Sequence, residues 1–229
     1  MGIKERQERD REATRRAILD AARELFVSEG YQNVSIRKIA ERIEYSPAAI
    51  YGYFPSKDDI FFALAEEGFH LLGQGLKNPA EAERLAALAP LERIRVSFRR
   101  FYEFSREYPQ YFALMFVDRS VPRINREYER FAFARDMRAR LIGHIEECVR
   151  TGVFPGTVEP SVASRLLMMG LLGVAVMRMS DRLPDIENAD GLAEDVLSVV
   201  LAGLQSGVTL TSTVADCSLD EQTISRQAS

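Results

Sequence analysis

Residues 46–57 combine a clear helix start with side chains that suit contact with nucleic acid. Ser46 is a good N-cap, and Pro47 suits the first helical position, where no amide hydrogen is needed. Ile50 and Phe54, four residues apart, would turn one face of this helix toward a core. The opposite face would then carry small and tyrosine side chains: Pro47, Ala48, Ala49, Tyr51, Gly52 and Tyr53.

These outward side chains fit a DNA duplex. The small residues at 48, 49 and 52 would allow close approach to base edges, and alanine methyl groups can meet a thymine methyl group. The hydroxyl groups of Tyr51 and Tyr53 can donate to phosphate oxygens, which positions a helix without reading the base sequence. The alternative is an ordinary helical hairpin with a solvated surface. Spacing alone leaves the two interpretations nearly even, and surface tyrosines with small neighbours favour binding.

Cationic side chains lie on the two flanking segments. Ser35 is a good N-cap for a helix over 36–43, which carries Arg37 and Lys38 in its first turn. Ser56 begins a further helix, where Lys57 lies near free backbone amides, and both would favour a phosphate. The predicted DNA-binding residues are therefore Ser35, Arg37, Lys38, Ser46, Pro47, Ala48, Ala49, Tyr51, Gly52, Tyr53 and Lys57.

Apolar residues recur at helical spacing almost throughout the chain, and strand patterns are nearly absent. The sequence predicts an all-α fold of about nine helices, in which a three-helix helix-turn-helix head precedes a larger helical body. Proline and glycine break the pattern between helices. The clearest helices are expected over about 11–28, 36–43, 47–53, 57–73, 123–151, 160–180 and 191–206.

Residues 14–62 resemble the N-terminal domain of TetR/AcrR-type transcriptional regulators. The matching motifs cover about a fifth of the chain and are Ile18-Leu19-x-Ala21-Ala22-x-x-Leu25-Phe26-x-x-x-Gly30-Tyr31, then Val34-Ser35-Ile36-x-x-Ile39-Ala40, then Ser46-x-x-Ala49-Ile50-Tyr51-x-Tyr53-Phe54-x-Ser56-Lys57. The resemblance implies a dimer in which the helix starting at Pro47 enters the major groove, with Tyr53 and Lys57 on phosphates. One departure is Glu44, where the family turn usually holds glycine. A left-handed conformation there would cost about 1 kcal/mol.

The resemblance also suggests a division of the chain. Residues 1–12 are expected to form a flexible N-terminal arm, and residues 13–60 the helix-turn-helix DNA-binding domain. Residues 61–207 would form a ligand-binding and dimerisation domain. The tail, 208–229, is poor in large apolar side chains and is expected to be disordered.

The body is rich in aromatic and methionine side chains. Such stripes are more often ordinary core than a cavity, but the resemblance implies a small apolar or amphipathic effector bound between these helices. Methionine suits an adaptable pocket wall. The predicted ligand-binding residues are Phe98, Phe101, Tyr102, Tyr111, Phe112, Met115, Phe116, Met137, His144, Met168 and Met169.

The last two expected helices carry stripes of small and apolar residues. One interpretation buries both stripes within a single subunit. The resemblance instead implies a four-helix bundle in which each subunit of a homodimer contributes two helices, and we favour this interpretation. The predicted dimer-interface residues are Leu166, Met169, Gly170, Gly173, Met177, Leu192, Val196, Val199, Val200 and Gly203.

Composition limits the other possibilities. The net charge of the 229 residues is −4, while residues 1–57 carry a net +2, so a nucleic-acid site must come from local placement. The apolar run 166–177 would reach only about 18 Å as a helix, short of a bilayer core of roughly 30 Å. The N-terminus lacks a signal peptide pattern and the two cysteines form no framework, so we expect a cytoplasmic protein without a membrane partner.

No catalytic or cofactor pattern stands out. His144 and Cys148 have a spacing that could hold a metal, but no further ligand is evident nearby, so we expect no metal, no cofactor and no enzyme activity. The prediction is a homodimeric repressor, released from a palindromic operator by a small apolar or amphipathic effector. The alternatives are a helical protein-interaction adaptor and a small-molecule-binding protein that does not bind DNA.

Overall fold

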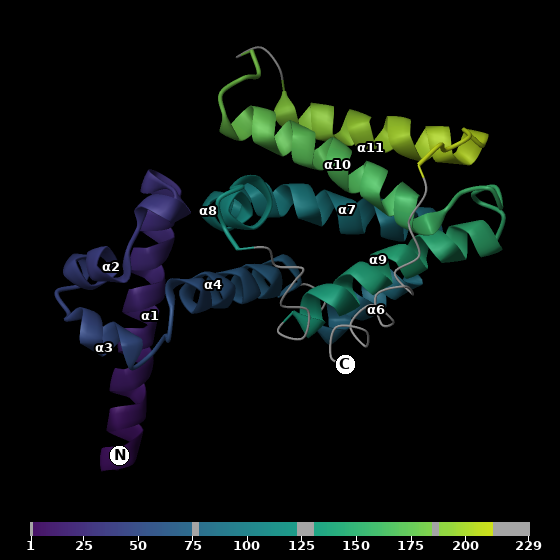
Figure 1. The fold of residues 1–229 in the computed structure, drawn as a ribbon. Coiled ribbons are helices and arrows are strands. Elements are labelled where there is room, and N and C mark those ends of the chain that lie inside the picture. Colours follow the sequence, from purple (N-terminus) through teal and green to yellow (C-terminus); the bar gives the residue numbers. More distant parts are fainter. Residues whose placement is uncertain (1, 75–77, 123–130, 185–187, 213–229) are drawn as a thin grey trace, which may run out of the picture.

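The computed structural model describes residues 2–74, 78–122, 131–184 and 188–212. Within those ranges the fold is all-helical, and no strand is formed, as the sequence predicts. A small head at one end is joined to a larger body (Figure 1). The expected tail beyond 212 and the expected helical residues 123–130 lie outside the described residues.

The head contains the first three helices. These are α1 (Ile3–Glu29), α2 (Ile36–Arg42) and α3 (Pro47–Tyr51), with a short 3-10 turn, η1 (Tyr31–Asn33), after α1. Helix α4 (Lys57–Leu72) leads from the head to the body (Figure 1). The remaining described elements are α6 (Pro79–Ala87), α7 (Pro90–Glu107), α8 (Pro109–Phe112), the π-helical turn η2 (Ala113–Val117), α9 (Ala132–Arg150), α10 (Pro160–Met179) and α11 (Ala189–Ser206).

The helix starts in the head follow the predicted capping. The side chains of Ser35, Ser46 and Ser56 each accept a hydrogen bond from the amide three residues later. Proline occupies the first position of α3, as expected, where its missing amide hydrogen costs nothing. These three serine caps are confirmed, and they place the starts of α2, α3 and α4 where the sequence predicts them.

Helix α1 differs from the sequence prediction. It begins at Ile3 rather than near Arg11, so residues 3–12, predicted to be a flexible arm, are its first turns. This stretch has no apolar face, which is why hydrophobic periodicity does not indicate it. It is instead rich in Glu, Arg and Gln, which are good helix formers, and it places Glu5 and Glu12 four residues before an arginine.

Polar contacts join the head to the body. On α1, Arg16 forms an ion pair with Glu67 of α4. Two turns further, Arg23 donates to the side-chain oxygen of Gln110 at 3.0 Å and to the hydroxyl of Tyr111 at 2.9 Å, both on α8. Helix α1 therefore belongs to the head by its core and touches the body along its second half.

Helices α10 and α11 lie side by side across one end of the body (Figure 1). A Cβ atom added at Gly170 would lie 2.6 Å from Cγ1 of Val196, so glycine allows the two helices to approach closely within one subunit. The 20 residues of α10 are also long and apolar enough to cross a membrane, judged by length and composition alone, and 39% of its apolar window is buried. Helix α10 begins before the 166–177 run and ends after it, so it also includes Arg165 and Arg178.

Candidate DNA-binding surface

Helix α3 presents the face that the sequence predicts. Ile50 and Phe54 are buried in the head core, together with fully buried Ile39 of α2 and Ile18 of α1. The Tyr51 side chain is 55% exposed on the other side. Pro47, Ala48 and Gly52 are also exposed, while Ala49 and Tyr53 are partly covered. The inward and outward faces of this helix are therefore as predicted.

The turn before α3 contains a left-handed residue. Glu44 has φ of +60°, a conformation that favours glycine because a Cβ atom crowds the following carbonyl oxygen. The amide of Tyr45 donates to the carbonyl of Ala40 at 2.9 Å across this turn. Glu44 thus occupies the conformation expected for the family glycine, and the turn is formed without one.

Lys57 holds two parts of the head together. Its ammonium group donates to the carbonyl oxygens of Tyr31 at 2.8 Å and Val34 at 2.9 Å, and it lies 4.1 Å from the centre of the Tyr31 ring. The Tyr31 hydroxyl donates to Asp58, and burial together with this carboxylate raises the pKa of Tyr31. Two of the three ammonium N–H groups are used in this way, which leaves one for a phosphate. No spacing pattern in the sequence indicates these backbone partners.

The other predicted cations already have partners. Arg37 is exposed and pairs with Glu41 at 2.8 Å along α2, and Lys38 pairs with Glu29 of α1. The Arg37 pair is exposed and contributes little to stability, so exchanging its carboxylate for a phosphate is not costly, whereas the Lys38 pair is partly buried. Ser35 and Ser46 are occupied as helix caps. The eleven predicted DNA-binding residues thus lie in one small head, and several of them also build it.

Sequence reasoning missed two further residues at this surface. The guanidinium of Arg11 lies 5.9 Å from the centre of the Tyr53 ring, and that of Arg15 lies 5.4 Å from the centre of the Phe54 ring. Both arginines come from α1. Their only sequence signal is a spacing of four residues, in phase with Ile18 and Ala22.

The body residues predicted to bind a ligand fall into two groups. Phe101, Phe112 and Phe116 form a ring cluster with centroid separations of 5.1 to 5.3 Å, and the buried side chains of Phe98 and Met115 belong to the same core. By contrast, Met168 and Met169 lie exposed on α10. The ring cluster is one contiguous part of the body, whereas the two α10 methionines belong to its surface.

The polar candidates in the body have individual roles. The Tyr102 hydroxyl donates to Asp190 of α11 at 2.9 Å, and the Tyr111 hydroxyl accepts from Arg23. Met137 and His144 lie on α9, where burial lowers the pKa of His144 and favours its neutral form. These groups are therefore distributed over several helices of the body.

Metal ligation and thiol chemistry find little support at His144 and Cys148. Among the described residues, no three His, Cys, Asp or Glu side chains are grouped as a metal site would need. Cys148 is fully buried, and burial raises the pKa of its thiol to about 11. A thiol in that environment stays protonated near neutral pH and is a poor nucleophile or ligand.

The head and its exposed α3 define a helix-turn-helix protein with an all-helical body. Residues 18–64 match the sequence model of the tetR family of bacterial regulatory proteins. The HTH-type transcriptional repressor Rv1474c of Mycobacterium tuberculosis is 39% identical over 80 residues, which cover 35% of this chain and 36% of that relative. The match therefore spans about a third of the length of this curated relative.

Two solved structures show the same fold along most of the chain. The TetR family transcriptional regulator PfmR from Thermus thermophilus has a TM-score of 0.62 at 22% identity, covering 84% of this chain and 99% of that one. FadR from Bacillus subtilis, solved in complex with stearoyl-CoA, has a TM-score of 0.65 at 17% identity, covering 82% and 97%. Residues 18–64 thus match the tetR family model, and the two solved structures show that the chain has the same fold over most of its length.

Replacing Glu44 by glycine should stabilise the fold. Glycine adopts the left-handed conformation without the Cβ clash, so the free energy of unfolding should rise by up to about 1 kcal/mol, measured by urea denaturation. The matched control is Glu44→Ala, which removes the same charge but keeps the Cβ atom and should gain nothing. Duplex DNA binding by Glu44→Gly should be at least as tight as that of the wild type. Weaker binding would contradict the expectation that the Glu44 side chain does not contribute to DNA binding.

Lys57→Ala should lower both stability and DNA affinity. Removing the donor to two carbonyl groups should cost about 1 to 2 kcal/mol in the free energy of unfolding. DNA affinity should fall for all sequences. The negative slope of log affinity against log salt should become shallower by about 0.9 for each phosphate that Lys57 neutralises. Asp58→Asn, which disturbs the same junction but keeps the ammonium, should leave that slope unchanged. An unchanged slope in Lys57→Ala would show that Lys57 does not bind phosphate.

Proposed function

We propose that this chain is a cytoplasmic homodimeric transcriptional repressor, released from a near-palindromic operator by a small apolar or amphipathic effector. Residues 13–60 would be its DNA-binding domain and residues 61–207 its effector-binding and dimerisation domain. The observation that carries the proposal is the outward face of α3, where small side chains and Tyr51 stand exposed over a core held by Ile50. The relatives named above are regulators rather than enzymes, which agrees with this assignment.

The exposed face of α3 has the right chemistry for the major groove. Ala48 and Gly52 leave room beside base edges, and Tyr51 has a hydroxyl for a phosphate or base edge. Helix α3 is only five residues long, so its position depends on the core and on the turn at Glu44. Both are fixed by packing or by backbone hydrogen bonds, which is what a protein needs to hold a helix in register with base pairs.

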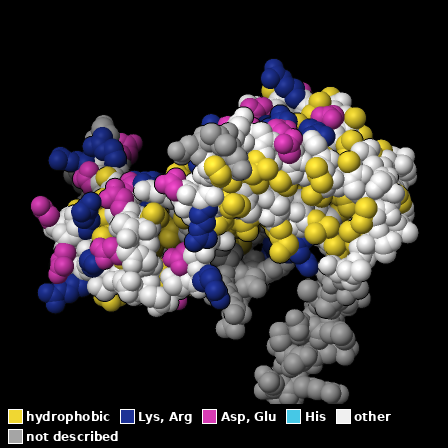
Figure 2. Space-filling view, turned by 90° about the horizontal axis from the view of Figure 1, so that it is seen from above, with side chains coloured by type: hydrophobic (Ala, Val, Ile, Leu, Met, Phe, Trp, Pro, Cys, Tyr) yellow, Lys and Arg dark blue, Asp and Glu magenta, His cyan; other side chains and the backbone are white. Residues whose placement is uncertain are grey.

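Homodimerisation is supported by an uncovered apolar face on α10 and α11. Of the eleven exposed large apolar side chains in the described residues, five lie on these two helices: Leu166, Met168, Met169, Met177 and Val199. Apolar side chains gather on the face of the molecule seen in Figure 2. Such patches on soluble proteins usually mark interaction sites. A second copy would cover this one by two-fold symmetry.

The glycines divide the predicted interface between two roles. Gly170 faces Val196 of the same subunit, so it serves packing within one chain. Gly173 is exposed, and a Cβ atom added there would meet nothing within 4 Å. Gly173, with Met169 and Val199, is therefore available to a partner subunit, whereas Gly170 already has its contact.

Effector release requires a link from body to head. Contacts from Arg16 to Glu67 and from Arg23 to Tyr111 connect α1 with α4 and α8. The ring cluster includes Phe112 of α8 itself, packed against Phe101 and Phe116. An effector would shift DNA affinity only if it bound one arrangement of these helices better than the other, since equal affinity would shift nothing.

Selection of bound fragments from random duplex DNA tests the proposed function. We expect a near-palindrome whose half-sites are separated by about one helical turn, roughly 34 to 36 Å, or a multiple of it. A palindrome would support both DNA reading and dimerisation. If the protein shows no salt-dependent affinity for duplex DNA, one of the two alternatives holds. It would then be a protein-interaction adaptor or a small-molecule-binding protein.

A charge at the α10–α11 face should dissociate the dimer. Val199 is 71% exposed in the single subunit, so Val199→Glu should leave the subunit folded while burying an unpaired carboxylate in the dimer. Sedimentation should then show a monomer, and affinity for the palindrome should fall. Val27→Glu on α1 is the matched control, because it places the same charge at another exposed valine away from this face. A dimeric Val199→Glu protein would refute this interface.

A further inference from the structure

The first turns of α1 form a free-standing helix. Residues 4–13 are exposed, and the first buried residue of α1 is Ile18. At 1.5 Å per residue this exposed length is about 15 Å. Figure 1 shows α1 continuing past α3 to the N-terminus. The helix therefore extends beyond the head core on the side where α3 lies.

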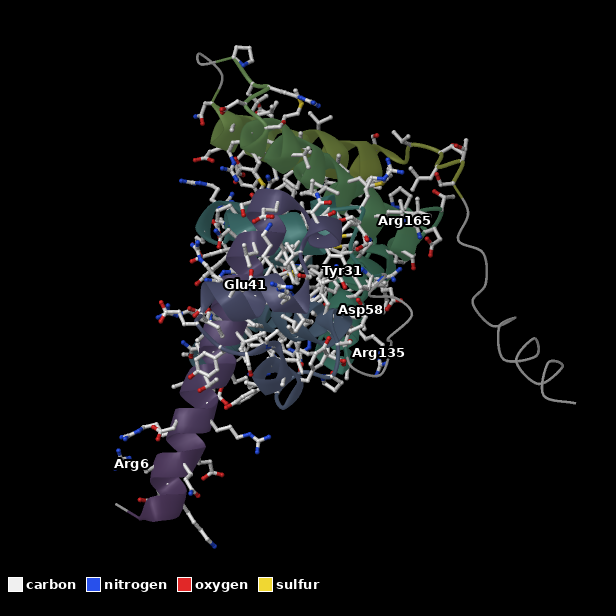
Figure 3. The ribbon with its side chains drawn as sticks, turned by 60° about the vertical axis from the view of Figure 1, so that its left-hand side comes forward. Arg6, Tyr31, Glu41, Asp58, Arg135 and Arg165 are labelled. Atoms are coloured by element: carbon white, nitrogen blue, oxygen red, sulfur yellow. The ribbon has the colours of Figure 1, made fainter. Side chains whose placement is uncertain are left out.

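One face of this extension carries cations. At about 100° per residue, Lys4, Arg11 and Arg15 fall within roughly 40° of one another around the helix axis. This is the same face that, further along α1, holds Ile18 and Ala22 against the head core. We call the residues Lys4, Arg11 and Arg15 the cationic stripe. Arg6 lies on the opposite face and projects from the end of the helix (Figure 3).

The cationic stripe joins the candidate DNA-binding surface. The Arg11 and Arg15 guanidinium groups lie over the rings of Tyr53 and Phe54, the residues that follow α3. The Thr14 and Tyr45 hydroxyl groups, 3.4 Å apart, bring the same part of α1 to the turn before α3. The Arg11 and Arg15 end of the stripe therefore lies near the segments that precede and follow α3. From there the stripe continues along α1 toward Lys4.

The cations of the stripe are little neutralised, as is Arg6 on the far face, whereas those on α2 are paired. Arg37, Lys38 and Arg42 each have a carboxylate partner within the head. In the described part of the chain, Lys4 and Arg11 form no ion pair, and Arg15 has only a long, exposed one with Glu12 at 3.7 Å. Glu8, about 40° from the centre of the stripe, is the nearest opposing charge along the helix.

We propose that the cationic stripe binds the sugar-phosphate backbone that borders the major groove occupied by α3. The inference rests on the proposed function, because it places α3 in that groove. DNA carries one phosphate per about 1.7 Å of helix axis, so cations spread over about 15 Å of helix would meet a continuous row of charge. The exposed residues 4–13 include no large apolar side chain, so this segment lacks the hydrophobic anchor that a membrane or a protein groove would need.

The test compares two variants in the full-length protein. Lys4→Gln/Arg11→Gln removes two stripe charges, and Arg6→Gln removes one from the far face of the same segment. Affinity for a random-sequence duplex is measured over a series of salt concentrations. For the double variant, the negative slope of log affinity against log salt should become shallower by about 0.9 for each phosphate that is no longer neutralised. A dimer loses two charges from each of its two heads, so the change can reach about 3.6. Arg6→Gln should keep the wild-type slope.

A third variant tests the sign of the effect. Glu8→Gln removes the carboxylate beside the stripe, so it should strengthen duplex binding. Circular dichroism and unfolding curves should match the wild type for all variants, because the changed side chains are exposed and outside the core. Equal slopes for the wild type and the double variant would overturn the inference while leaving the proposed function intact. A wild-type protein that binds no duplex would overturn both.

Discussion

The burial of Ile50 and Phe54 is the constraint on which the candidate DNA-binding surface depends. These two side chains fix the rotation of a five-residue helix that is too short to be stable alone. Once they are packed into the core that also holds Ile39 and Ile18, the remaining side chains of α3 must face outward. The exposed chemistry is thus a consequence of the core, and the Ser46 cap and Pro47 only determine where the helix begins.

Helix α1 connects the functional parts of the molecule because it contributes to three of them. Its middle part fills the head core through Ile18, and its second half reaches α8 through Arg23. Its first turns carry Arg11 beside Tyr53. A rigid helix that touches the body at one end and the candidate DNA-binding surface at the other would transmit a tilt without any internal rearrangement. That property suits a protein in which an effector in the body must alter the head.

Local features of the fold could be predicted from the sequence, and long-range contacts could not. The serine caps and the two faces of α3 each follow from a few neighbouring residues, whereas the left-handed residue at Glu44 is expected only from the family resemblance. The carbonyl partners of Lys57 lie more than twenty residues earlier in the chain, and no spacing rule indicates them. The first turns of α1 escape prediction for a different reason. Their helix depends on residue propensity and charge spacing, and a search for apolar periodicity does not detect either of these.

The exposed methionines of α10 show why an apolar side chain alone does not identify a pocket. By sequence, Met169 is a candidate both for the effector site and for the dimer interface, since its type suits either. In one subunit Met169 is 60% exposed, and Val199 and Gly173 on the same pair of helices are exposed too. The ring cluster at Phe112 is inside, next to the contacts that join α8 to the head. If the α10–α11 face is held by a second copy, that face becomes the fixed reference for both subunits. A change at the ring cluster that tilted each subunit about it would then alter the separation of the two heads.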